Sequence, residues 1–194
     1  MTRSIESVAV IGAGTMGAGI AAASAAAGCR VLILDMNQET IEAALQQVDE
    51  ENRHLVTAGL VDTDLEAVSE YDWICEAVVE DLAVKRDLFS RLEEIRKDGS
   101  VISSNTSGIP LRQISEGMPE RFRSDVAITH FFNPVKVMRL FELVPGEDTD
   151  QEVISAFTDF GADRLGKGVV HAKDTVNFIA VSYTHLTLPT ILLV

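Results

Sequence analysis

Residues Val8–Asp35 read VAVIGAGTMGAGIAAASAAAGCRVLILD. This pattern predicts an apolar strand, a glycine turn, a helix of small residues and a second strand that ends on an acid. Gly12, Gly14 and Gly17 have the spacing G-x-G-x-x-G, and Asp35 follows about twenty residues later, as in the βαβ units that bind dinucleotides. The stretch therefore predicts a dinucleotide site at the glycine turn.

Each part of this unit has an expected role. Gly12 permits a tight turn, Gly14 leaves room for a pyrophosphate, and Gly17 lets the helix approach the strand. The free N–H groups and the positive dipole end of the helix then face the phosphates. A carboxylate at Asp35 accepts hydrogen bonds from ribose hydroxyls and repels the extra phosphate of NADP, so the predicted cofactor is NAD. We expect the binding residues here to be Gly12, Ala13, Gly14, Thr15, Met16, Gly17 and Asp35.

Two other interpretations fit parts of this stretch. The segment from Ser7 to Cys29 is uncharged and long enough to suggest a membrane span, although its glycines and alanines make it less apolar than a leucine-rich span. As a signal peptide it has a single basic residue, Arg3, with Glu6 close by. The register of strand, turn, helix, strand and acid favours the cofactor site.

The composition suits a soluble globular protein, since 46% of the 194 residues are hydrophobic and 24% are charged. This length is enough for one domain with a substantial core. The net charge of −14 argues against nucleic acids and anionic membranes as partners, because both repel an acidic surface.

The cysteines and histidines bear on location and on metal binding. Cys29 and Cys75 lie far apart in apolar surroundings, as expected of buried free thiols in a reducing compartment. With no C-x-x-C motif and four scattered histidines, we expect no metal site. Because we find no targeting signal either, we expect a cytoplasmic location.

The remaining sequence predicts alternating strands and helices, and so a Rossmann-like, doubly wound α/β domain with a mainly parallel sheet and helices on both faces. Further strands are expected at residues 71–79, 100–104, 125–132, 138–144 and 168–172. Helices are expected at residues 38–58, with Gly59 as the C-cap, at 82–95 and at 153–165, and residues 60–70 are an acidic connection with modest helical content.

Polar residues gather where the predicted strands end, which is the edge at which α/β sheets bind ligands. Glu76 lies in an apolar run, so it is either at the strand end or held by hydrogen bonds. Lys85 lies near the start of the next helix, where a solvated charge is the alternative interpretation. The cluster at residues 105–108 suits a ligand edge and equally an ordinary turn.

His130 lies near the carboxyl end of the strand at 125–132, and Glu142 lies in the run at 138–144. Pro134 stops the first strand from continuing, so the two runs could lie side by side with these residues facing each other. A carboxylate bonded to one imidazole nitrogen fixes the tautomer and raises the basicity of the other nitrogen. The alternative is a core histidine without chemistry.

Five motifs together resemble the NAD-binding domain of the L-3-hydroxyacyl-CoA dehydrogenases. The similarity runs from about Ser4 to Ala180, and its most specific element is HFFNP at residues 130–134. The motifs are GAGTMGAGIA (12–21), EAVVEDLAVKRDLF (76–89), SNTS (104–107), THFFNPVKVMRLFELV (129–144) and LGKGVVHAKDT (165–175).

The resemblance implies NAD-dependent oxidation of an L-3-hydroxyacyl-CoA to a 3-ketoacyl-CoA, a step of fatty-acid β-oxidation. It implies that His130 is the catalytic base and that Glu142 orients it, and it implies a homodimer for the full-length protein. Ser107 and Asn133 match residues beside the nicotinamide and the substrate, and Glu80 and Lys85 match cofactor contacts.

The sequence departs from this family near its end. Val176 and Asn177 stand where the family has Pro-Gly, and Val181 and Ser182 stand where it has Asn-Arg and continues into a helical domain. We therefore expect an NAD-binding domain at residues 1–180 and an unassigned tail at 181–194, which is non-native or frame-shifted. The alternative for the tail is a divergent terminal strand.

Three other functional hypotheses also fit the sequence. The chain could be an NAD-binding module that is inactive without its substrate and dimerisation domain. It could be a dehydrogenase of a related fold that acts on a hydroxy acid or sugar acid without coenzyme A. The family recruits coenzyme A with polar and basic residues after the second strand, and residues 46–59 have few basic groups, so these contacts are not assigned. It could also be a shortened protein that does not fold stably, because the missing helices would leave apolar surface uncovered.

Overall fold

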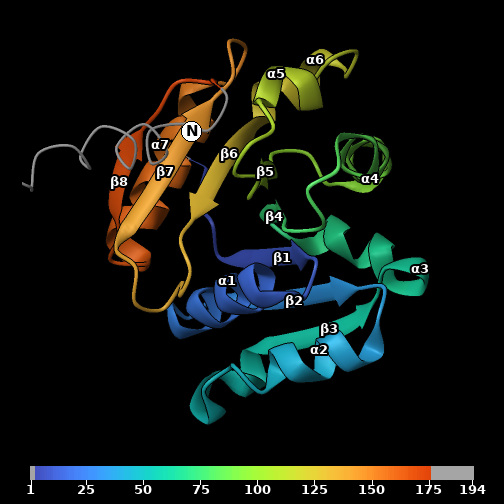
Figure 1. The fold of residues 1–194 in the computed structure, drawn as a ribbon, viewed down its shortest axis with the longest axis vertical. Coiled ribbons are helices and arrows are strands. Elements are labelled where there is room, and N and C mark those ends of the chain that lie inside the picture. Colours follow the sequence, from blue (N-terminus) through green and yellow to red (C-terminus); the bar gives the residue numbers. More distant parts are fainter. Residues whose placement is uncertain (1–2, 176–194) are drawn as a thin grey trace, which may run out of the picture.

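The apolar run Ser7–Ile11 forms β1, an interior strand of an eight-stranded sheet with the order β3-β2-β1-β4-β5-β6-β7-β8 (Figure 1). This arrangement comes from a computed structural model, which describes residues 3–175. Every neighbouring pair of strands is parallel except β6 and β7, which are antiparallel. The predicted doubly wound, mainly parallel sheet is therefore confirmed.

The strands follow the apolar runs of the sequence, and the helices follow the amphipathic segments. The strands are β1 (Ser7–Ile11), β2 (Arg30–Asp35), β3 (Val56–Leu60), β4 (Trp73–Glu76), β5 (Val101–Ser104), β6 (Val126–Phe131), β7 (Leu140–Pro145) and β8 (Gly168–His171). The α-helices are α1 (Thr15–Ala26), α2 (Gln38–Leu45), α3 (Val61–Asp64), α4 (Leu82–Ile95), α5 (Leu111–Ile114), α6 (Glu120–Asp125) and α7 (Gln151–Asp159). Short helical turns are η1 (Glu50–Leu55), η2 (Leu65–Glu70) and η3 (Phe160–Arg164).

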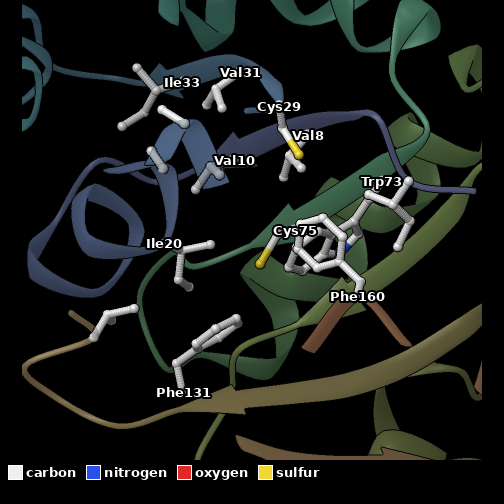
Figure 2. Packing of buried hydrophobic residues seen from close by; sticks show 14 of the residues in the cluster. Val8, Val10, Ile20, Cys29, Val31, Ile33, Trp73, Cys75, Phe131 and Phe160 are labelled. Carbon is white, nitrogen blue, oxygen red and sulfur yellow. The ribbon is translucent and has the colours of Figure 1, made fainter. Parts of the chain in front are cut away.

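The two faces of the sheet carry separate hydrophobic cores, as the alternation of side chains along a strand requires. Val8 and Val10 of β1 point to the face covered by α1, α2 and α7, where Trp73 and Phe160 also pack (Figure 2). Ala9 and Ile11 point to the opposite face, which α3, α4, α5 and α6 cover. Helices therefore cover both faces of the sheet, which is the middle one of three layers.

The prediction of one helix over residues 38–58 is wrong after residue 45. Asn37 caps α2, which ends at Leu45, and residues 56–60 form the edge strand β3. Val31 of β2 pairs with Val56, and Gly59 lies inside the strand instead of capping a helix. The helical spacing of apolar residues was misleading here, because the free edge of β2 pairs with the β-branched Val56 and Thr57.

Several other boundaries also differ from the expected ones: the strands expected at 71–79, 100–104, 125–132, 138–144 and 168–172 lie at 73–76, 101–104, 126–131, 140–145 and 168–171. β4 ends at Glu76, because the chain turns away from the sheet there and residues 77–80 lead to α4. The helix expected at 153–165 begins at Gln151 and changes at Phe160 into the π-helical turn η3. The departures at Val176 and the tail at 181–194 lie outside the described residues.

No helix in the described part of the chain is long and apolar enough to cross a membrane. The uncharged segment at 7–29 instead comprises β1, the glycine turn and α1, which has 12 residues.

Candidate active site

The candidate site lies at the carboxyl ends of β1, β4, β5 and β6. The helix that follows β1 packs on one face of the sheet and the helix that follows β4 packs on the other. The position between the ends of these two strands is therefore the topological switch point, where open α/β sheets bind ligands. Four loops follow these strands: residues 12–14, 77–81, 105–110 and 132–139.

The three glycines of the turn have different surroundings. Gly12 has φ +102°, and a Cβ there would lie 2.5 Å from the carbonyl oxygen of Ala77. A Cβ at Gly17 would lie 1.7 Å from the carbonyl oxygen of Gly12. A Cβ at Gly14 would meet nothing within 4 Å, so this glycine serves no packing need of the protein. The open space at Gly14 fits a ligand that must approach the backbone closely.

The surroundings of the turn also suit the phosphates and ribose of a dinucleotide. Gly14 precedes α1 without a side-chain cap, and the first turn of α1 carries no acid, so its N–H groups and dipole favour an anion. Asp35 Oδ2 accepts a 2.6 Å hydrogen bond from the N–H of Ala13, and its Oδ1 accepts a 3.0 Å bond from the N–H of Asn37. These bonds hold the carboxylate beside the turn. The exposed Thr15 and half-buried Met16 lie at the start of α1.

Glu76 and Lys85 form a buried ion pair at the end of β4. The side chains are 0% and 1% exposed, and Lys85 Nζ lies 2.7 Å from Glu76 Oε1. Glu76 also accepts hydrogen bonds from the N–H of Val78 and the hydroxyl of Ser104. The solvated interpretation of Lys85 is therefore wrong. Lys85 Nζ also lies 3.3 Å from Oε2 of Glu80, which follows β4 at this edge of the sheet.

Glu80 ties this ion pair to the loop that follows β5. Its Oε1 accepts hydrogen bonds from the Thr106 hydroxyl at 2.5 Å, the Ser107 N–H at 3.1 Å and the Gly108 N–H at 3.0 Å. Burial raises the pKa of Glu80, but the Thr106 hydrogen bond and the Lys85 charge outweigh it, so the pKa lies below its ordinary value of 4.5. The loop that carries Ser107 is thereby fixed to the end of β4.

We expect Lys85→Met to lower the free energy of unfolding by about 3–5 kcal/mol, because it leaves the buried Glu76 carboxylate without its cation. Lys97→Met is the matched control. It removes the half-exposed pair with Asp72 at the opposite end of the sheet and should cost about 1 kcal/mol or less. Urea unfolding of both variants measures the difference. Equal losses would show that the buried pair is not held as described.

His130 and Glu142 face each other across the antiparallel pair β6 and β7. His130 Nδ1 lies 2.8 Å from Glu142 Oε2, and the side chains are 14% and 1% exposed. An ionised carboxylate only accepts, so Nδ1 is the donor of this hydrogen bond, and in the neutral tautomer that fits it the lone pair is on Nε2. The contact that the sequence suggested is present, and it gives His130 the geometry of a general base oriented by a carboxylate.

The other predicted site residues lie on the loops around this pair. Ser107 and Asn133 are exposed, on the loops that follow β5 and β6 respectively. Phe132 packs against the His130 ring with centroids 4.4 Å apart. The structure thus brings the glycine turn, the Glu80 cluster, Ser107 and the histidine pair to one edge of the sheet. Thr106 was not singled out in the sequence, although its position in the SNTS motif was the available signal.

The described residues suggest no metal centre and no reactive cysteine. Within residues 3–175, no group of three or more His, Cys, Asp or Glu side chains is placed to hold a metal ion. Cys29 and Cys75 are buried free thiols, and burial raises the pKa of Cys75 to about 12. Cys75 therefore stays protonated at neutral pH.

Known proteins resemble this chain in sequence and in fold. The family described as 3-hydroxyacyl-CoA dehydrogenase, NAD binding domain, matches residues 7–175. A probable 3-hydroxyacyl-CoA dehydrogenase of Bacillus subtilis is 38% identical, over 93% of this chain and 27% of that protein. The 3-hydroxybutyryl-CoA dehydrogenase of Mycobacterium tuberculosis is 36% identical, over 92% of this chain and 67% of that protein. The crystal structure of M. tuberculosis FadB2 matches with a TM-score of 0.84 and 34% identity, over 93% of this chain and 68% of that one.

The chain spans only part of some relatives: 27% of the B. subtilis protein and 56% of a probable 3-hydroxyacyl-CoA dehydrogenase of Deinococcus radiodurans. The family match nevertheless covers nearly all of the described residues. From its fold, its site and these similarities, the chain belongs to the NAD-binding domain family of the 3-hydroxyacyl-CoA dehydrogenases, whose cofactor is NAD.

Proposed function

We propose that this chain is the NAD-binding part of an enzyme that oxidises L-3-hydroxyacyl-CoA to 3-ketoacyl-CoA, in fatty-acid β-oxidation. The observation that carries the proposal is the hydrogen bond between the His130 imidazole and the buried Glu142 carboxylate, at the sheet edge that holds the glycine turn. A base at this edge suits the removal of a hydroxyl proton beside a bound nicotinamide.

In the proposed reaction, His130 Nε2 takes the proton of the substrate 3-hydroxyl. Glu142 holds the Nδ1–H and stabilises the imidazolium that forms, so the ring keeps one orientation and one tautomer. NAD, when bound, supplies the acceptor for the hydride that leaves carbon 3 of the substrate. Ser107 and Asn133, exposed on the neighbouring loops, are proposed to orient the nicotinamide and the substrate.

The cofactor contacts are proposed residue by residue. The turn from Gly12 to Gly17 would hold the pyrophosphate through N–H groups, and Asp35 would accept hydrogen bonds from the ribose. Glu80 is half-exposed and would border the nicotinamide half of the cofactor, while Lys85, which is buried behind it, would act by holding Glu80.

The test is calorimetric titration of this chain with NAD and with NADP, followed by hydride-transfer assays on the protein at its complete length. We expect NADP to bind much more weakly than NAD. Asp35→Asn should lower the ratio of the NAD affinity to the NADP affinity by about tenfold, because it removes the charge that repels the 2′-phosphate of NADP. Asp62→Asn, on the exposed surface of α3, is the matched control and should leave both affinities unchanged. An unchanged NAD:NADP ratio in Asp35→Asn would contradict the role of Asp35.

The substrate class is tested separately. 3-Hydroxybutyryl-CoA is compared with free 3-hydroxybutyrate, and turnover of the free acid alone would favour the dehydrogenase without coenzyme A. NAD binding without turnover of either would favour the inactive module.

Several other expectations remain proposals. A cytoplasmic location is supported by Cys29 and Cys75, which are free thiols. The homodimer and the acyl-CoA partner rest on the family resemblance, and the acidic net charge supports the absence of nucleic acid and membrane partners. The division into a domain at 1–180 and a tail at 181–194 also stays a prediction.

A further inference from the structure

We propose that Asn105 is a positioning residue, whose carboxamide fixes the end of β6 and thereby places His130 relative to the loop that carries Ser107. The assignment of His130 as the base rests on the proposed function. The structural part of the inference stands on contacts of the described chain alone.

The first step is the mismatch in length between β5 and β6. Their paired register runs from Ile102 opposite Val126 to Ser104 opposite Ile128, where β5 ends. The last three residues of β6, Thr129 to Phe131, therefore extend beyond the partner strand. His130 lies in this overhang. A backbone N–H that faces the missing partner needs another acceptor.

The side chain of Asn105 supplies that acceptor. Its Oδ1 lies 2.9 Å from the N–H of Phe131, the residue directly after His130. Because the donor here is a backbone N–H, only the carboxamide oxygen can face it. The bond is partly buried, and so it is protected from competition by bulk water.

The main chain of Asn105 is anchored on the other side. Its N–H donates to the carbonyl oxygen of Glu76 at 2.8 Å, which extends the pairing between β4 and β5 by one residue. One residue therefore bridges β4 and β6 across the end of β5. Ser107, two residues further along, is held by Glu80 through its N–H.

The consequence is a fixed distance between two groups that act together in the proposed reaction. Glu142, on β7, sets the orientation of the imidazole ring. Asn105, at the end of β5, fixes the position of the β6 backbone next to His130. Misplacement of reacting groups by about 1 Å can cost about 10²-fold in rate. Asn105 itself is a positioning residue, because its oxygen is engaged within the protein.

The test compares Asn105→Ala with Asn105→Asp in this chain, using amide hydrogen exchange and nitrogen NMR signals of the His130 imidazole. In Asn105→Ala, the Phe131 amide should exchange about tenfold faster, and the His130 signals should shift. Asn105→Asp keeps an acceptor oxygen and should restore the protection to within about twofold. Neither readout requires enzymatic activity, so failure here is distinct from failure of the proposed function.

The matched control is Asn37→Ala, which also removes an asparagine oxygen that accepts backbone N–H groups, at the start of α2. It should leave Phe131 and His130 unchanged. Unaltered exchange in Asn105→Ala, or no rescue by Asn105→Asp, would overturn the proposal. If Asn105→Ala does not fold, the unmutated chain decides, because a Phe131 amide that exchanges at the rate of an unstructured peptide would also overturn it.

Discussion

Turnover should fall by about 10²–10⁴-fold when His130 is replaced by glutamine, while the affinity for NAD should change by less than about twofold. Glutamine keeps a polar side chain of similar reach but cannot take up a proton, so it removes the base and leaves the space filled. The proposed contacts for the pyrophosphate and ribose lie at other strand ends, on the glycine turn and Asp35. The expected effect is therefore on kcat.

The measurement combines two experiments on the same substitution. Stopped assays with 3-hydroxybutyryl-CoA on the protein at its complete length give kcat, and calorimetry gives the NAD affinity. His171→Gln is the control, because this histidine is exposed on β8 and its ring nitrogen contacts Thr158. Normal turnover in His130→Gln would refute the assignment of the base. An equal loss in His171→Gln would show that the effect is not specific to the site.

Alanine substitutions at two glycines of the same motif should have different effects, on stability at Gly17 and on NAD affinity at Gly14. Gly17→Ala should lower the free energy of unfolding by about 3 kcal/mol or more, because the new Cβ would lie 1.7 Å from the backbone oxygen of Gly12. Gly14→Ala should leave stability within about 0.5 kcal/mol of the original, since its Cβ enters open space. It should nevertheless weaken NAD binding by about tenfold or more, because the pyrophosphate approaches the backbone there.

Urea unfolding and NAD titration of both variants make this comparison. Gly168→Ala is the matched control, because a Cβ there has its nearest neighbour at an ordinary 3.8 Å. It should change neither stability nor affinity. If Gly14→Ala binds NAD as tightly as the original chain, the turn is structural only. If Gly17→Ala is as stable as the original, the close approach of α1 to the turn is not rigid.

The glycine turn could be predicted from the sequence because it is a local feature. A glycine turn between an apolar strand and a small-residue helix depends on neighbouring residues, so the spacing of Gly12, Gly14 and Gly17 was sufficient to predict it. The same holds for α4, whose predicted bounds of 82–95 are those observed. The sequence also suggested that His130 and Glu142 face each other, because two short extended runs with Pro134 between them can form an antiparallel pair, and they do.

Other features depended on partners distant in the sequence. Residues 56–60 have an apolar spacing compatible with a helix, and only the free edge of β2 makes them a strand. Lys85 has the sequence context of a surface charge, but it is buried because Glu76 supplies a carboxylate from the end of another element. Local propensities differ by about 1 kcal/mol, so a strand pairing or a buried ion pair outweighs them.

The doubly wound class, the glycine turn with Asp35 and the candidate residues of the site thus followed from local patterns in the sequence. How those residues are held depends on tertiary contacts: Glu80 binds the loop at 106–108, and Asn105 binds the backbone of Phe131. The reason is physical. Short-range spacing fixes which backbone conformations are accessible, whereas hydrogen bonds and ion pairs between strand ends form only when the sheet brings those ends together.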